Sequence, residues 1–386
     1  MVMDYLLKAK PKYFPYLICG FTVLGPTPKI LAQSICSEPS AQKLKVNFFG
    51  DYFVPHGSQL SPNSLTEVRE LIHMADHTVV NLEGTLSGGQ GRQFPKAPFA
   101  LKMTPSSLDF LTQNGIYNVT RANNHAMDYG KKGAEETQRE LDARGISHTG
   151  VGTNRFEASK PLMLFSAGKP NGLKIAVVAF AHTYPLEAWA THTRFGVNPA
   201  DPSTIKEAIL RARQQADFVV PVFHWGTELS IKAHEYQKKL AKWAIQSGAS
   251  TVIGHHAHVA QETELMDGVQ VSYGLGNFLF FGRITGALQL GKMLTFCKKG
   301  DEISLESTFI PLEVVHSGKG YEVKRRSEES LAKVLKTYLV TNKKSLFHQL
   351  THFYLHNENK LINPYLKSVS QSSEPAPIKQ AQTGWP

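Results

Sequence analysis

The chain has 386 residues, and its 41% hydrophobic content can supply the core of one large α/β domain or two ordinary ones. With this composition we expect the chain to fold rather than to be largely disordered. The formal net charge of +10 suits an anionic polymer, anionic lipid or a phosphate-bearing substrate as partner. We expect no nucleic-acid partner, because the sequence has no zinc-finger spacing, no helix-turn-helix pattern and no basic stripe interleaved with aromatic residues.

Residues 1–36 have the features of an export segment. Three lysines precede an apolar run over residues 13–24, and small residues follow near Ala32. As a helix this run would be about 18 Å long, which is short of the ~30 Å hydrocarbon core of a membrane. We therefore expect a cleaved signal peptide, with an uncleaved N-terminal anchor as the alternative.

The chain has three widely spaced cysteines, Cys19, Cys36 and Cys297, and no CxxC pair. This spacing excludes a structural zinc site and a thioredoxin-like motif. Cys19 lies inside the predicted export segment. The other two would either form a disulfide in an exported protein or remain inert thiols. We expect the inert thiols.

From Leu44 the sequence alternates apolar, strand-like runs with helical patterns, which predicts an α/β domain with parallel strand pairing over residues 44–315. The predicted strands are 44–49, 78–82, 116–120, 173–180, 217–223 and a run from Thr251. The predicted helices include 64–74, with a capping box at Ser64 and Glu67, 105–113, a helix ending near Arg144, and one over 236–247. Antiparallel strands are expected at 269–281, 292–297 and 302–311.

After about residue 315 the composition becomes rich in lysine and serine. We predict a basic, helical C-terminal extension over residues 316–367, with amphipathic helices at 327–339 and 345–354. Residues 368–386 have the composition of a disordered tail.

Five predicted strands end in polar side chains that can bind a metal. They are Asp51, Glu83, Asn124 with His125, His224, and the cluster His255, His256 and His258. This mixture of carboxylates, amide and imidazoles suits Mn, Fe or Zn at one edge of a sheet. A bridging carboxylate such as Glu83 would hold two cations about 3.5–4 Å apart, activating a water and binding phosphoryl oxygens. His125 would then protonate a leaving oxygen or stabilise the developing charge.

Each of these residues also has a structural interpretation. A lone histidine at a strand end is more often a satisfied polar group than a ligand, and Gly50-Asp51 alone is a common turn. The co-occurrence of the residues at strand ends favours the metal site. We expect His56 to be an exposed loop residue, leave open whether His182 lines the pocket, and interpret Gly88–Gly91 as a flexible loop, with a lid as the minority view.

Six motifs follow one another in a familiar order. They are Gly50-Asp51, Asn81-Leu82-Glu83-Gly84, Ala122-Asn123-Asn124-His125-Ala126-Met127-Asp128-Tyr129-Gly130, His224-Trp225-Gly226-Thr227-Glu228, Gly254-His255-His256-Ala257-His258 and Tyr273-Gly274-Leu275-Gly276-Asn277-Phe278. In these motifs, their order and their spacing, the sequence resembles the CapA family of poly-γ-glutamate capsule biosynthesis proteins over roughly residues 44–315.

The resemblance implies a calcineurin-like metallophosphoesterase fold, a four-layer α/β/β/α sandwich with two mixed sheets. It implies a periplasmic location or one at the outer face of a bacterial cytoplasmic membrane, beside the membrane-bound subunits of a polymer synthase. It also implies that His125 is the catalytic histidine, that Asp128 orients it and that Glu228 supports the ligands. The implied ligands of one or two divalent ions are Asp51, Glu83, Asn124, His224, His256 and His258.

One position departs from the wider superfamily, which usually has a histidine two residues after the first aspartate. Phe53 occupies that position here. The leading hypothesis is an exported, metal-dependent protein of bacterial capsule or surface-polymer biosynthesis. Its hydrolase site would be of the phosphoesterase type, with an anionic polymer or a phosphate-bearing substrate as partner. The alternatives are a non-catalytic polymer-binding or scaffold subunit of a capsule synthesis or export complex, and a soluble phosphatase of small molecules.

Overall fold

The computed structural model describes residues 35–86, 100–166, 172–183, 185–282, 287–317 and 320–327. The predicted disordered tail, both predicted C-terminal helices, the Gly88–Gly91 loop and nearly all of the predicted leader lie outside these residues. No helix within the described ranges is both long and apolar enough to span a membrane.

The larger sheet has eight strands, ordered β18-β17-β16-β1-β2-β5-β6, with β15 paired to β1. β1, β2, β5 and β6 are parallel, as is β15 with β1, whereas β16, β17 and β18 are antiparallel. The bounds are β1 (Gln42–Phe53), β2 (His77–Leu82), β5 (Asn118–Thr120), β6 (Ser147–Thr149), β15 (Asn277–Phe280), β16 (Gln289–Lys299), β17 (Glu302–Ser317) and β18 (Gly320–Arg325).

The second sheet has six strands, ordered β13-β14-β12-β11-β9-β8. The four inner strands are parallel and both edge strands are antiparallel to their neighbours. The bounds are β8 (Leu162–Phe165), β9 (Lys174–Ala181), β11 (Phe218–His224), β12 (Val252–His255), β13 (Thr263–Met266) and β14 (Val269–Ser272). Two small sheets pair β3 (Thr85–Leu86) with β4 (Lys102–Met103) and β7 (Val151–Gly152) with β10 (Gly196–Val197).

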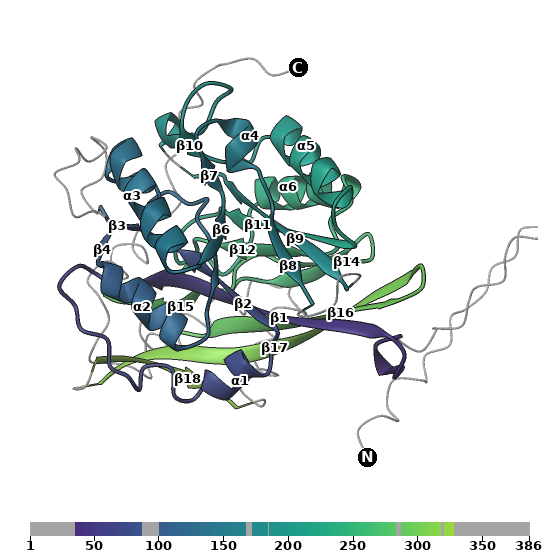
Figure 1. The fold of residues 1–386 in the computed structure, drawn as a ribbon, viewed down its shortest axis with the longest axis horizontal. Helices are drawn as coiled ribbons and strands as arrows, with labels where there is room; N and C mark the ends of the chain where they lie inside the picture. The colour runs from purple at the N-terminus through teal and green to yellow at the C-terminus, as the bar shows by residue number, and fades with distance from the viewer. Residues whose placement is uncertain are drawn as a thin grey trace, which may run out of the picture. The chain divides into compact units, whose positions relative to one another are not determined.

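Helices cover the outer faces of both large sheets (Figure 1). Buried residues of α1 and α2 share an apolar cluster with β2 and β5, and those of α5 and α6 share another with β9 and β11. The helices are α1 (Arg69–His73), α2 (Pro105–Gln113), α3 (Gly130–Ala143), α4 (Arg155–Ala158), α5 (Pro202–Arg213) and α6 (Glu235–Gln246), with short 3-10 turns η1 (Ile35–Ser37) and η2 (Leu186–Ala188).

The two sheets pack face to face through a third apolar cluster. Leu44, Val46 and Phe48 of β1 alternate along the strand, so their side chains share one face and meet Val177 and Ile253 of the other sheet. The layers therefore run helix, sheet, sheet, helix. This confirms the predicted α/β/β/α sandwich with two mixed sheets.

Three predicted elements differ from the structure. The helix expected over 64–74 is confined to α1, because residues 62–68 form turns and Ser64 makes no capping contact with the helix. The strand expected over 269–281 is divided by the turn at Gly274 and Gly276 into β14 and β15, which belong to different sheets. Moreover, β15 is parallel to β1 rather than antiparallel.

The third difference concerns the predicted helical extension from residue 316. β17 continues to Ser317, and β18 adds an edge strand to the eight-stranded sheet. Val323 is buried against this sheet, whereas the other residues of β18 are more exposed. The strand is only six residues long and mostly polar, so its sequence carries only a weak signal for a strand.

Cys36 and Cys297 form a disulfide that joins η1 to β16. The expectation of two inert thiols was therefore wrong, and the alternative that we ranked second is the one observed. Spacing along the chain could not decide this, because a sequence separation of 261 carries no signal that the two cysteines lie close together.

A lysine is buried between the two sheets. Lys292 of β16 donates to Ser272 Oγ across the interface (3.0 Å), and burial lowers the pKa of its ammonium to about 7. The unfolded chain keeps this proton up to about pH 10.5, so burial of the lysine destabilises the fold fully below pH 7 and less as the pH rises toward 10.5.

We therefore expect Lys292→Met to increase the free energy of unfolding at neutral pH, by on the order of 3–5 kcal/mol, and this gain to shrink steadily toward alkaline pH. Urea denaturation of both proteins between about pH 6 and about pH 10 measures the difference. The exposed Lys174→Met serves as the control and should show little change at any pH. A gain that stays constant across this pH range would contradict the assignment.

Candidate metal centre

The carboxyl ends of parallel strands from both sheets meet at one edge of the sandwich. From the larger sheet come Asp51 near the end of β1, Glu83 just after β2 and Asn124 in the loop after β5. From the smaller sheet come His224 at the end of β11 and His256 just after β12. The structure thus brings together side chains that lie up to about two hundred residues apart in the sequence.

Glycine permits the close approach that places Asp51. A Cβ on Gly50 would lie 1.9 Å from the carbonyl oxygen of Gly276, so a larger residue does not fit. The pairing of β1 with β2 also shifts register between Phe48 and Asp51. Such an irregularity redirects side chains at the end of a strand, and here it occurs next to the candidate ligand.

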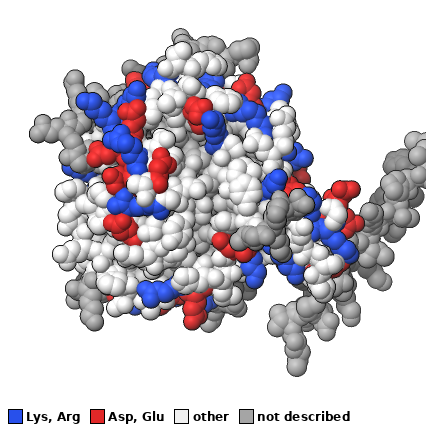
Figure 2. All heavy atoms as spheres, viewed as in Figure 1, with Lys and Arg blue, Asp and Glu red and all other residues white. Residues whose placement is uncertain are grey.

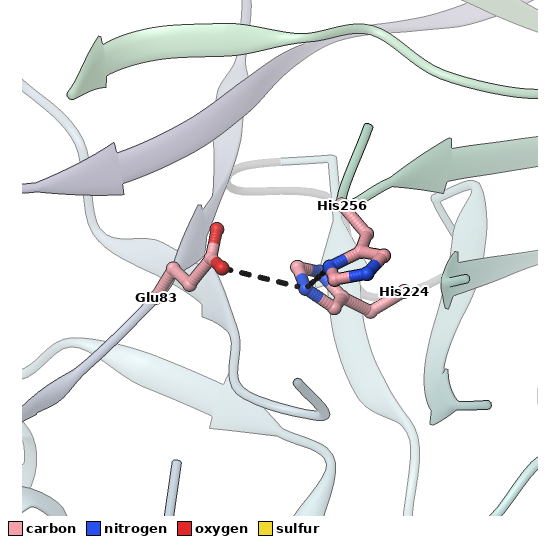
Figure 3. A group of neighbouring side chains, drawn as sticks. All are labelled: Glu83, His224 and His256. Carbon is pink, nitrogen blue, oxygen red and sulfur yellow. Dashed lines mark hydrogen bonds and ion pairs between the residues drawn. The ribbon is translucent and has the colours of Figure 1, made fainter. Parts of the chain in front are cut away.

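The predicted ligands form two adjacent groups that share Glu83. One consists of Glu83, His224 and His256 (Figure 3), and the other of Asp51, Glu83 and His258. Within each group, one ligand atom per residue lies within 4.8 Å of the others. This arrangement allows one carboxylate to serve two ions.

The distances from His224 to the other two members of the first group, and to the neighbouring Asn124, are close to those in a coordination shell. His224 Nε2 lies 2.8 Å from Asn124 Oδ1, 3.1 Å from His256 Nδ1 and 3.5 Å from Glu83 Oε1. Ligands about 2.1 Å from a common ion lie about 3.0–3.4 Å from one another. The four side chains therefore fit a divalent transition metal with little rearrangement.

The Glu83 carboxylate is the strongest sign that the cluster binds a cation. It is fully buried, and neither of its oxygens accepts a hydrogen bond. Burial raises the pKa of Glu83 to about 8, although the charges of His258 and His125 oppose this effect. A buried carboxylate whose oxygens accept no hydrogen bond is costly, and a bound cation would remove that cost.

Burial also keeps imidazoles of the cluster neutral. It lowers the pKa of His224 to about 3 and that of His256 well below its usual value. Neutral imidazole has the lone pair that a metal ligand needs. For His258 burial acts in the same direction, but the charges of Glu83 and Asp51 outweigh it and raise the pKa to about 9. A metal ion would displace that proton.

Two of the histidines have an unusual backbone. His256 has a φ of 89° and His258 a φ of 57°, in the left-handed region that side chains other than glycine rarely adopt. Strain of this kind persists where the surrounding structure imposes it, and it concentrates at functional sites. This left-handed backbone conformation turns both imidazoles toward the cluster, although only Ala257 separates the two histidines in the sequence.

His125 and Asp128 lie side by side at the edge of the cluster. Asp128 Oδ2 is 2.7 Å from His125 Nδ1 and also accepts a hydrogen bond from the backbone N–H of Leu101. His125 Nε2 faces Glu83 Oε1 at 3.9 Å. The carboxylate thus fixes the ring with Nε2 toward the ligands, which is the geometry expected of a catalytic histidine held by an aspartate.

The family model described as "Bacterial capsule synthesis protein PGA_cap" matches residues 45–281, which include every ligand of the cluster. This match covers more than half of the chain. The protein belongs to this family of bacterial capsule synthesis proteins.

Known proteins of similar sequence agree with this family assignment. This chain is 30% identical over 243 residues to the PGA biosynthesis protein CapA of Bacillus subtilis, covering 61% of this chain and 63% of that protein. It is 28% identical over 242 residues to the capsule biosynthesis protein CapA of Bacillus anthracis, covering 61% and 55%. The chain thus spans less than two thirds of the length of either relative.

Among solved structures, the sulfate thiohydrolase SoxB of Thermus thermophilus aligns with 76% of this chain and 60% of its own, at 14% identity and a TM-score of 0.42. A score this low supports no conclusion about activity. The evidence for the order of the layers is this chain's own sheets and core clusters.

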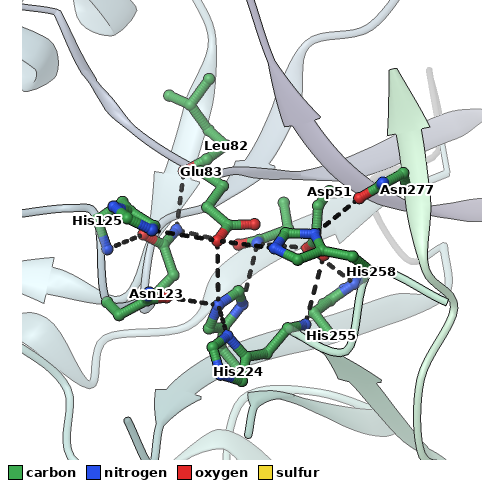
Figure 4. Close-up of polar contacts among 12 residues, drawn as sticks. Asp51, Leu82, Glu83, Asn123, His125, His224, His255, His258 and Asn277 are labelled. Atoms are coloured by element: carbon green, nitrogen blue, oxygen red, sulfur yellow. Dashed lines mark hydrogen bonds and ion pairs between the residues drawn. The ribbon is translucent and has the colours of Figure 1, made fainter. Parts of the chain in front are cut away.

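Sequence reasoning missed two asparagines that connect the ligands, and Figure 4 labels one of them, Asn123. Asn81 Nδ2 donates to Asp51 Oδ1 (2.8 Å) and lies 3.2 Å from His224 Nδ1, which links ligands from the two sheets. Asn123 donates to Asn81 Oδ1 and accepts from the backbone N–H of His125. Both asparagines lie inside motifs that carried the resemblance, but only their neighbours Glu83 and Asn124 were assigned roles.

Other residues singled out in the sequence lie around the centre. Glu228 is half-buried, and its charge affects the pKa of His258. His182 is half-buried and donates its backbone N–H to the carbonyl oxygen of His224. His255 is buried with Nδ1 3.6 Å from Asp51 Oδ1, and it belongs to neither ligand group. His56 lies in an exposed turn.

Phe53 lies two residues after Asp51, at the position where the sequence departs from the histidine expected from the resemblance. Its ring packs against Phe280, with centroids 5.1 Å apart, and Phe280 in turn packs against His258 at 4.7 Å. The group formed by Asp51, Glu83 and His258 therefore has an apolar wall on this side.

Proposed function

We propose that the protein is an exported, metal-dependent hydrolase of the phosphoesterase type that acts in the biosynthesis of a bacterial surface polymer similar to poly-γ-glutamate. The observation that carries the proposal is the buried Glu83 carboxylate, which has no hydrogen-bond donor and is shared by two ligand groups. Membership of a capsule synthesis family supports the polymer context.

Two groups of side chains would hold the metal, which we expect to be Mn, Fe or Zn. Glu83, Asn124, His224 and His256 would hold one ion, and Glu83 with Asp51 and His258 a second. A divalent ion supplies a Lewis acid for a phosphoryl oxygen and lowers the pKa of a bound water.

The remaining chemistry falls to His125 and Asp128. Because Asp128 accepts from Nδ1, the proton that His125 exchanges with a substrate is the one on Nε2, on the side of Glu83. A histidine so oriented can donate to the leaving oxygen without reorienting. The half-buried Glu228 adds negative charge to the same region.

We propose that the protein works at the outer face of the membrane, with membrane-bound polymer synthase subunits as partners. Two features support its export. One is the predicted leader over residues 1–36. The other is the disulfide between Cys36 and Cys297, because disulfides persist in oxidising compartments.

The experiment uses the full chain, with Mn²⁺ or Zn²⁺, against a phosphomonoester, a phosphodiester and a γ-glutamyl polymer. We expect metal-dependent turnover of at least one of them. Protein that binds metal yet turns over none of the three would overturn the enzymatic part of the proposal.

A non-catalytic polymer-binding or scaffold subunit is the second candidate, and Phe53 in place of a ligand favours it. On the face shown in Figure 2, basic and acidic side chains are interspersed rather than gathered into a basic surface for an anionic polymer. Cells that still make and export polymer with His125→Ala protein would support the scaffold, whereas loss of polymer with a folded variant would support catalysis.

A further inference from the structure

The peptide bond between Gly276 and Asn277 is held at both ends. The carbonyl oxygen of Gly276 accepts from the backbone N–H of Asp51 (2.9 Å), and the N–H of Asn277 donates to Gln289 Oε1 (2.7 Å). Gly276 has a φ of +77°, and a Cβ there would lie 1.8 Å from Gln289 Oε1. Only glycine fits this position. The backbone of Asn277 is therefore fixed relative to the strand that carries Asp51.

The side chain of Asn277 reaches a candidate ligand. Asn277 is buried, and its Oδ1 lies 2.8 Å from His258 Nδ1, as Figure 4 shows. An amide oxygen only accepts, so Nδ1 carries the hydrogen and Nε2 keeps the lone pair in the neutral ring. Nε2 is the atom that faces Glu83 Oε1, at 3.8 Å. Histidines that bind a metal commonly donate their other N–H to such an oxygen.

Asn277 also competes with Asp51 for the same hydrogen. Asp51 Oδ2 lies 3.3 Å from His258 Nδ1, farther than the amide oxygen of Asn277. Without the amide, Nδ1–H would turn to the carboxylate and reduce the negative charge that Asp51 offers to a cation. The amide therefore orients His258 and keeps its Nδ1–H from turning fully to Asp51, which already accepts a hydrogen bond from Asn81 Nδ2.

We propose that Asn277, held in place by Gln289, is a positioning residue of the metal centre that selects Nε2 of His258 as the ligand atom. In the sequence this segment stood out only as the last of the six motifs that carry the family resemblance, and Asn277 had no assigned role. The inference rests on the proposed function in one respect, which is that the cluster binds a metal.

The test measures the Kd of Zn²⁺ for the full chain by competition with a chelator. Asn277→Leu removes the acceptor at similar size, and we expect binding about 10–100-fold weaker than wild type. Asn277→Asp keeps an acceptor oxygen and should bind within about threefold of wild type or more tightly. Asn47→Leu is the matched control, since Asn47 is a buried asparagine of β1 that donates to the carbonyl oxygen of Leu71, away from the ligands.

A second measurement needs no variant. NMR of the Zn²⁺-loaded wild type with ¹⁵N-labelled histidine should show His258 bound through Nε2 with a protonated Nδ1. Binding through Nδ1, equal Zn²⁺ affinity of wild type and Asn277→Leu, or an Asp variant as weak as the Leu variant would each overturn the assignment. Wild-type protein that binds no Zn²⁺ would overturn the metal centre itself, which separates the two failures.

Discussion

Replacing His125 by alanine should lower turnover by about 10²–10⁴-fold while the protein still folds and binds metal. His125 Nε2 faces the shared carboxylate at 3.9 Å, and no predicted ligand atom belongs to this ring. The loss should therefore appear in kcat, measured with the phosphoester that the wild type hydrolyses, and the metal content of the variant should match that of wild type.

A matched control exists in the chain. His148 also pairs with an aspartate, with Nε2 3.2 Å from Asp142 Oδ1, but on β6 and outside the ligand groups. His148→Ala should keep turnover within about threefold of wild type, as expected of a change outside the site. If His125→Ala retains full turnover, or loses its metal, the assigned role is wrong.

Asp128→Asn tests the orientation of the same ring. The variant keeps the size of the side chain but offers an NH₂ group that favours the wrong tautomer of His125. We expect turnover to fall with the metal content and the circular dichroism spectrum unchanged. A variant as active as wild type would show that the 2.7 Å contact does not orient the histidine.

Glu83→Gln should have the largest effect on metal binding. Because both ligand groups contain Glu83, its loss weakens both, and we expect Kd to rise by at least about 100-fold for Mn²⁺ or Zn²⁺. The same change should stabilise the metal-free protein by roughly 1–3 kcal/mol, since it removes a buried acid whose oxygens accept no hydrogen bond.

These opposite changes distinguish a functional carboxylate from a structural one. Chelator competition measures the first and urea denaturation of chelator-treated protein the second. Glu264→Gln is the control, because Glu264 accepts from Tyr273 outside the cluster and its loss should not alter the Kd. Unchanged metal affinity together with a less stable fold would mean that Glu83 is a structural residue.

The strand ends of the fold could be predicted from the sequence because buried parallel strands have nearly continuous apolar runs. β9 and β11 follow the predicted ranges to within one residue at each end. β18 and the division between β14 and β15 could not be predicted from the sequence, because a short polar edge strand and a glycine-rich turn have no distinct hydrophobic periodicity. The disulfide depended on proximity in the fold, which spacing does not reveal.

Prediction of the candidate site from the sequence is limited in the same way. Ligand types such as Glu83 and His256 are visible at strand ends, and the structure brings them together as expected. The residues that orient them are neutral amides, Asn81 and Asn277, whose side chains have no distinctive spacing. Their contacts depend on close approach between strands, which requires the register of β1 with β2 for Asn81 and with β15 for Asn277.

The most direct measurement is anomalous diffraction from crystals of the full chain grown with Mn²⁺. We expect an anomalous peak in contact with the Glu83 carboxylate and with His224 Nε2 and His256 Nδ1. Any second peak should lie on the side of Asp51 and His258. A refined structure with no anomalous peak at Glu83 in saturating Mn²⁺ would contradict it.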